Sequence, residues 1–351
     1  MVALLVFPLG RASADQVTVA TDNKSAADSA GTFEIGVGVN PDDVFVAQAR
    51  VANSNLFGSG QRLSLTATVS AIRSSVDLVH EVPDLAAGFD LKTELFVHAN
   101  TYPGFTRTDA GGGVTLGRQL DRANRVYARY RIADVAMAAG GDHDVARRMV
   151  AGGSLGEGVL ATLGGGIVHD TLDDAALPRR GNRFELSADR ADRRWGSGYD
   201  LVQASGSAVY ARQLGPLTLR LRGHADYVHT SDPMGVPLAF RLQHDGHAEV
   251  RGYGLASGNL VGDNLEASGR AELELPVWSK LGLSVAGWAD AGARFNTDAA
   301  WGGSAMDSVR RSVGFSLIWR SPIGPLRFDY AIPLDGNDRR GQFLFGFGGA
   351  M

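Results

Sequence analysis

Residues 265–275 alternate without exception between two kinds of side chain. The odd-numbered positions from Leu265 to Leu275 hold only Leu, Ala or Gly, whereas the even-numbered positions between them hold only Glu, Ser or Arg. Successive side chains of a β-strand point to opposite faces of the sheet, so this spacing predicts a strand with one apolar and one polar face. A soluble two-layer sandwich and a membrane barrel both use strands of this kind.

The residue types on the polar face help to separate these two folds. In residues 326–332, Arg and Asp alternate with large apolar side chains, and in residues 217–222 Thr and Arg alternate with Leu. A polar face in bulk water favours Lys, Glu and Thr, whereas Arg and Asp can pair across the polar interior of a membrane barrel. The chain also has 46 Gly, roughly twice the usual share, which suits a bent sheet better than a helix. We therefore expect an all-β fold, a transmembrane antiparallel β-barrel.

Alternating segments bounded by Gly, Pro, Asn and Asp recur from Gly31 to the end of the chain, and no helical period lasts beyond a turn or two. We count about sixteen such segments and therefore expect about sixteen strands, an even number of the kind that bacterial barrels prefer. The strands are predicted to begin near Phe33, Val44, Gln61, Ser75, Gly88, Asp109, Ala123, Val159, Asn182, Tyr199, Leu217, Asn264, Leu281, Ser308, Pro325 and Gln342.

Hydropathy and charge exclude other classes of protein. The mean hydropathy is −0.06, and no stretch reaches the roughly 18 apolar residues that a membrane helix needs. That result excludes membrane helices and not strands, whose apolar residues alternate with lumen residues. A net charge of −4 offers no basic surface for nucleic acid, and the absence of Cys means that no disulfide holds the fold together.

The first residues resemble a targeting signal. Val2 to Leu9 form a short apolar core, and Ala12-Ser13-Ala14 fits an A-x-A cleavage pattern. We therefore divide the chain into a signal peptide (1–14) that lacks the usual basic start, a short linker (15–30) and the barrel (31–351). An apolar N-terminus without a targeting role is the alternative.

Motifs for catalysis and metal binding give little support to an enzyme. Gly152 to Gly156 match G-x-S-x-G, but the segment lies between two predicted strands rather than at the strand-to-helix turn that a nucleophile elbow requires. Asp170 and Asp173 lack a His or further carboxylate at ligand spacing, which favours turn capping over a metal. We expect a non-enzymatic protein without a cofactor or metal.

Four segments, in this order and spacing, resemble the barrel of the BamA/TamA superfamily of outer-membrane protein assembly factors (bacterial surface antigen type). They are Asp170 to Asp173 with Pro178 to Gly181 (D-x-R-D…P-x-x-G), Val250-Arg251-Gly252-Tyr253 (V-R-G-F/Y), Ser321 to Tyr330, and Phe343 to Met351. Leu172 and Met351 depart from the usual Arg and the usual terminal aromatic residue. Phe33 to Val39 and the turn from Asn53 to Gln61 fit the family more loosely.

The resemblance implies a loop that folds back into the lumen. It implies that Arg251 pairs with the inward carboxylates of Glu272 and Asp290. We call these three residues, together with Val250, Gly252 and Tyr253, the latch. A guanidinium suits such carboxylates because it offers a rigid fork of donors. We expect lumen water to hydrate this pair; a solvated loop Arg251 is the alternative.

The resemblance also implies a function at the seam between the first and last strands. Members of the family insert client barrels by strand pairing at a weak seam, which here would involve Phe33, Ile35 and Val37 opposite Phe343, Phe345 and Phe347. Outer-membrane lipid is the expected partner, with nascent barrels as possible clients. The linker is too short for a polypeptide-transport-associated (POTRA) domain, which implies a barrel-only member, a lost upstream part or a separate periplasmic POTRA protein. A passive pore and a polypeptide secretion pore are the alternatives.

Overall fold

The computed structural model describes residues 19–20, 31–38, 45–102, 104–139, 155–243, 250–254, 261–298, 304–321, 324–336 and 340–347. The predicted signal peptide lies outside the described residues, and so does the linker except for Val19 and Ala20. Residues 152–154 of the G-x-S-x-G match and Met351 also lie outside them.

Strands β1 to β17 all belong to one sheet. Their bounds are β1 Val19–Ala20, β2 Gly31–Gly38, β3 Val46–Leu56, β4 Gln61–Ser70, β5 Arg73–Ala86, β6 Phe89–Tyr102, β7 Phe105–Gln119, β8 Asn124–Ala139, β9 Gly158–Asp170, β10 Gly181–Ala191, β11 Leu201–Leu214, β12 Leu217–His229, β13 Leu265–Trp278, β14 Leu283–Asn296, β15 Ser304–Ser321, β16 Gly324–Pro333 and β17 Gln342–Phe347. The described residues also include the short 3-10 helices η1 Arg193–Trp195, η2 Leu238–Phe240 and η5 Ser279–Leu281. In the described part of the chain, no helix is long and apolar enough to cross a membrane.

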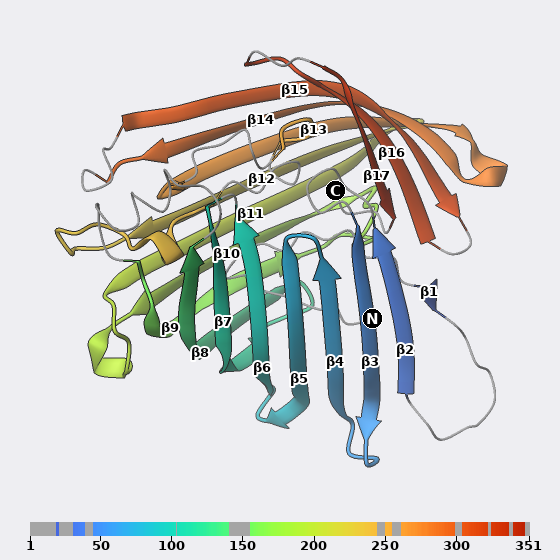
Figure 1. Ribbon diagram of the computed structural model, residues 1–351. Coiled ribbons are helices and arrows are strands. Elements are labelled where there is room, and N and C mark those ends of the chain that lie inside the picture. Colours follow the sequence, from blue (N-terminus) through green and yellow to red (C-terminus); the bar gives the residue numbers. More distant parts are fainter. Residues whose placement is uncertain are drawn as a thin grey trace.

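Each strand from β2 to β16 pairs antiparallel with the strand that follows it, β9 with β10 included. β17 then comes back to β2, with Cα atoms of the two strands within 8 Å. Figure 1 shows β3 to β8 as one wall, β11 to β15 as the opposite wall, and β16 and β17 descending toward β2. The expected all-β fold of about sixteen antiparallel strands is confirmed.

The side-chain alternation that predicted the strands sorts residues into two environments. Outward-facing Leu273 and Phe328 are 41% and 46% exposed, whereas their inward neighbours Glu274 and Arg327 are 2% and 6% exposed. The outer surface is thus apolar and the interior carries charged side chains, the reverse of a soluble sandwich. Glycines on inward faces make room for large neighbours: an added Cβ at Gly166 would lie 2.5 Å from the Tyr127 hydroxyl oxygen.

Connections of very different length collect at the two ends of the barrel. One end carries short turns such as residues 57–60, 87–88 and 215–216, and the other carries long connections such as residues 140–157, 192–200 and 230–264. Outer-membrane barrels place short turns on the periplasmic side and long loops on the extracellular side. The long connection at residues 230–264, which we call the insert, positions the candidate site.

Candidate functional site in the barrel lumen

The first part of the insert packs against the β7 to β9 wall. Val236, Ala239 and Phe240 lie in a buried cluster with Val135 of β8 and Leu160 of β9. The backbone N–H of Ala239 donates to the Leu155 carbonyl at 2.9 Å, and Arg107 of β7 donates to the Ala239 carbonyl. Ala191 of β10, Leu201 of β11 and Val228 of β12 belong to the same cluster, so this part of the insert follows the wall from β12, where the insert begins, to β7.

Arg251 fixes the later part of the insert to the opposite wall. Its Nε and Nη2 donate to the two carboxylate oxygens of Asp290 at 2.8 and 2.7 Å, the forked geometry that suits a guanidinium. Nη1 lies 3.3 Å from Asp329 Oδ2 and 3.8 Å from Glu272 Oε2. The face of the guanidinium covers the Trp288 ring, with its carbon 3.6 Å from the ring centroid. The structure thus brings Arg251 together with both predicted carboxylates.

The strand pattern explains why these groups converge. Glu272 of β13, Asp290 of β14 and Asp329 of β16 are inward-facing members of alternating strands, and Asp290 pairs in register with Arg270. Arg251 is 3% exposed and the side chain of Asp290 is fully buried. The expectation of a water-hydrated pair is wrong, because the insert and three strands enclose it.

Gly252 and Tyr253 attach the latch next to the last hairpin. Gly252 has φ +94°, and a Cβ there would lie 3.2 Å from Pro333 Cγ at the end of β16, so other residues would be strained. The Tyr253 hydroxyl donates toward the Arg311 and Asp335 carbonyls at 2.9 and 3.2 Å and accepts from the Asp335 N–H at 3.0 Å.

Further arginines extend the latch into a polar network. Arg327 binds both Glu272 and Asp329, with 2.9 Å between its Nε and Asp329 Oδ1. Arg220 lies 3.0 Å from Glu272 Oε1 and also pairs with Glu274. Buried carboxylates thus share their guanidinium partners, which offsets the cost of removing these charges from water.

A second group of bonds holds the base of the insert. Leu242 and Asp263 form an isolated bridge, with N–H to carbonyl distances of 2.8 and 2.9 Å. Arg294 of β14 donates to the Leu242 and Gln243 carbonyls at 3.2 and 2.8 Å and to Asp263 at 3.2 Å, and it also binds Glu266. The insert is therefore bonded at its base as well as at Arg251.

The predicted family segment closes the short-turn end. Asp173 Oδ1 accepts the backbone N–H groups of Arg179 and Arg180 at 2.9 and 3.1 Å, and Asp170 Oδ1 accepts that of Leu172 at 3.0 Å. Both carboxylates therefore cap the turn. Gly181 has φ +101°, which favours glycine.

This segment also contacts the lumen network. Leu177 packs on Ala286 and Ile318 inside the barrel. The carbonyl of Pro178 accepts from Arg220 Nε at 2.7 Å, and Arg220 is the residue that binds Glu272. A chain of polar contacts therefore runs from the turn to the latch.

Two of the predicted seam residues of β17, Phe343 and Phe345, face outward. Phe343 is 79% exposed and its ring lies 4.7 Å from that of Tyr330, while Phe345 lies 4.9 Å from Phe328. Phe347 pairs in register with Leu326 of β16. Across the seam, Phe33 of β2 is 51% exposed, and Ile35 and Val37 belong to the same strand.

A family model for the Omp85 superfamily domain matches residues 55–351. The chain belongs to the Omp85 superfamily. The outer membrane protein assembly factor BamA of Nitratidesulfovibrio vulgaris (strain Hildenborough) is 25% identical over 334 residues, 89% of this chain and 41% of that protein. The chain therefore spans less than half the length of this relative.

Solved structures share the fold of this Omp85 chain. BamA from Haemophilus ducreyi lacking POTRA domains 1-3 gives a TM-score of 0.78 at 19% identity, covering 94% of this chain and 74% of that one. CdiB from Acinetobacter baumannii gives 0.62 at 13% identity, covering 92% and 60%. The expected family, the barrel and its place in the outer membrane are confirmed.

Sequence reasoning missed several residues of the Omp85 site. Asp329 lies in the family-like segment Ser321 to Tyr330. Its place in the alternating pattern indicated a lumen-facing side chain, so this pattern could have identified it. Trp288 and Arg294 carry no motif of their own. Their contacts with the insert depend on how strands far apart in the sequence are arranged around the lumen.

Proposed function

We propose that this Omp85 barrel inserts client β-barrel proteins into the outer membrane, without enzymatic chemistry, by strand pairing at the seam between β2 and β17. The similarity to BamA over 89% of the chain supports this proposal. In this proposal, POTRA domains deliver the client. These domains belong to a separate periplasmic protein or to a longer chain.

The seam is the observation that carries the proposal. β17 has six residues and pairs along its length with β16. Among the described residues, its approach to β2 is less extensive than that of any other two neighbouring strands of the ring. The edge of β2 also accepts another strand, because Val19 and Ala20 of β1 pair with Ile35 and Glu34. Strand addition uses the backbone hydrogen-bonding groups of such an edge.

The latch holds the strands on the β16 side of the seam in place while the seam opens. Arg251 bonds to Asp329 of β16, the strand beside β17, and Tyr253 bonds next to the β16–β17 connection. In this proposal β14 to β16 form a fixed edge while β2 and β17 separate.

Secretion of a polypeptide through the lumen is the second candidate. Its support is the similar fold of CdiB, a likeness that speaks for the architecture alone. The insert is bonded to both walls of the lumen, at Ala239 and at Arg251, so passage of a polypeptide would require breaking one set of bonds.

Cross-linking the seam tests the proposal. A disulfide between Gly36→Cys and Gly346→Cys, with register variants at neighbouring positions, should stop client insertion into liposomes while ion conductance through the lumen persists. The control is a disulfide between Ala52→Cys and Ser64→Cys, which pair in register within the β3–β4 ladder. Insertion at the parental rate after complete seam cross-linking would refute lateral opening.

A further inference from the structure

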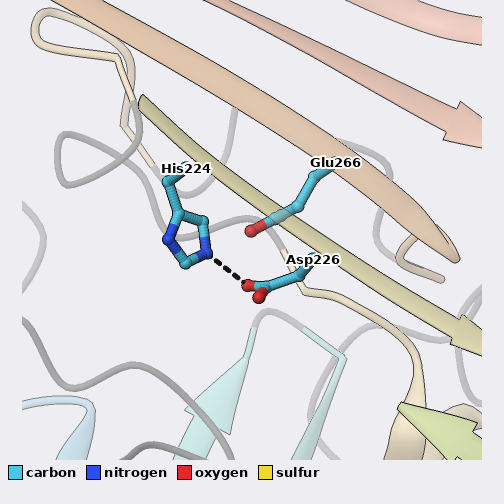
Figure 2. A group of neighbouring side chains, drawn as sticks. All are labelled: His224, Asp226 and Glu266. Atoms are coloured by element: carbon cyan, nitrogen blue, oxygen red, sulfur yellow. Dashed lines mark hydrogen bonds and ion pairs between the residues drawn. The ribbon is translucent and has the colours of Figure 1, made fainter. Parts of the chain in front are cut away.

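Three metal-ligating side chains converge on the lumen face of β12 and β13, outside the latch. His224 and Asp226 lie two residues apart on β12, and Asp226 pairs in register with Glu266 of β13. One ligand atom from each residue lies within 4.8 Å of the other two. Figure 2 shows the imidazole and both carboxylates pointing toward one common space between the two strands.

The strand geometry explains the convergence. Residues two apart on a strand share a face, and residues in register across a ladder stand side by side on that face. Two carboxylates in that position repel each other unless a positive group lies between or beside them. Arg294 supplies one such group to Glu266, and His224 Nε2 lies 2.8 Å from Asp226 Oδ2.

We propose that His224, Asp226 and Glu266 bind a divalent first-row transition metal, with Zn²⁺ as the best match. One imidazole and two carboxylates provide three ligands of the types that Zn²⁺ accepts and leave a fourth position for water. Mg²⁺ and Ca²⁺ prefer oxygen ligands throughout, so the imidazole disfavours them. The His224 and Asp226 side chains are 24% and 19% exposed, which gives a metal a path from lumen water.

The surrounding charges make this a reversible site. Arg294 already pairs with Glu266. Arg222 and Arg270 pair in register in the same ladder, two positions from the pair of His224 and Ser268. Their positive charge opposes a dication and should weaken its binding, so the metal would exchange with solution. This inference is independent of the proposed insertion function.

Metal binding would be linked to the base of the insert through one residue. Arg294 shares Glu266 with the proposed metal and also holds the carbonyls of Leu242 and Gln243. A metal that draws Glu266 away from Arg294 changes how firmly this arginine holds the insert. Removing Arg294 should conversely free Glu266 and strengthen metal binding.

A calorimetric titration tests the site: ZnCl₂ is added to the detergent-solubilised barrel after chelator treatment, and the heat of binding is measured. We expect one Zn²⁺ per barrel, and His224→Gln or Glu266→Gln should weaken binding by at least about tenfold, as loss of a group around a metal commonly does. Arg294→Ala should tighten it. Co²⁺ should give visible absorption bands in the parent that are lost in His224→Gln, and heat-modified gel mobility should show that each variant is folded.

His98 and Asp77 provide a matched control on another part of the lumen wall. Their side chains are bonded at 2.7 Å and have similar exposure, but the described residues place no third ligand with them. His98→Gln should leave Zn²⁺ binding unchanged. The proposal is wrong if His98→Gln weakens binding as much as His224→Gln does. It is also wrong if His224→Gln has no effect on Zn²⁺ binding and the double variant His244→Gln/His247→Gln abolishes binding.

Discussion

The guanidinium of Arg251 stacks on the indole of Trp288, with 3.6 Å between its carbon and the ring centroid. The indole is 5% exposed, and a Cβ at Gly314 would lie 2.3 Å from Trp288 Cζ2. Trp288 is therefore enclosed between the insert and the wall of the barrel. A desolvated cation–π pair of this kind contributes about 2 kcal/mol.

Trp288 should report the state of the latch through its fluorescence. Arg251→Ala removes the group that covers the indole, so the emission should shift to longer wavelength as water reaches the ring. Arg251→Lys should shift it less, since an ammonium can still cover part of the ring. The shift should vanish in the Trp288→Phe background. Identical spectra for the parent and Arg251→Ala would mean that Arg251 does not cover Trp288 in solution.

Loss of Arg251 should also lower the free energy of unfolding. Without Arg251, buried Asp290 loses its forked guanidinium partner, whereas Asp329 keeps Arg327. Removing one partner of a buried ion pair costs ~3–5 kcal/mol. Denaturant titration of the detergent-solubilised barrel measures this difference. Arg311→Ala is the control: Arg311 pairs with Asp335 but is 61% exposed, so its loss should cost ~0–1 kcal/mol. Equal effects of the two variants would contradict the buried latch.

Single cysteines in β5 should distinguish the lipid face from the lumen. Val76→Cys replaces a residue that is 48% exposed on the outer surface and should react only with a lipid-phase reagent. Asp77→Cys replaces an inward side chain that is 34% exposed and should react from water. Glu274→Cys should label poorly from water although it faces inward, because Glu274 is 2% exposed. Equal aqueous labelling of the β5 pair would exclude the barrel.

Gly166 should not tolerate a larger side chain. A Cβ there would lie 2.5 Å from both the Leu186 carbonyl oxygen and the Tyr127 hydroxyl, so Gly166→Ala should cost about 1–3 kcal/mol in free energy of unfolding. At Gly287, nothing lies within 4 Å of an added Cβ, so Gly287→Ala should be close to neutral. Unfolding titrations that rank the two variants in the opposite order would refute this packing.

Asp173 should make the turn between β9 and β10 sensitive to acid. Partial burial raises the pKa of its carboxyl, but the N–H groups of Arg179 and Arg180 outweigh this and hold the pKa below its ordinary value of 3.8. The resulting stabilisation is present above that value and is lost as pH falls through the lower pKa of the folded state. Because the carboxylate is exposed, Asp173→Asn should cost about 1 kcal/mol or less at neutral pH. The difference between parent and variant, measured by unfolding, should shrink below pH ~4; a difference independent of pH would contradict the capping role.

Alternation predicted the strands well because it depends on local geometry. Predicted first residues lie within four positions of the observed ones, from Gln61, which begins β4 as expected, to Asp109, four residues inside β7. The pairing of Arg251 with Glu272 and Asp290 rested on family resemblance. The burial of that pair was not predictable from one sequence, because it depends on how the insert packs between walls formed by distant strands.

The insert also restricts how the barrel can change shape. Its bonds to Arg107 of β7 on one wall and to Asp290 and Asp329 on the other connect the two walls across the ring. Strands added between β17 and β2 would lengthen only the arc from β16 through β2 to β7. The arc from β7 to β14 would keep its curvature, so a growing barrel would bulge on the seam side instead of widening evenly.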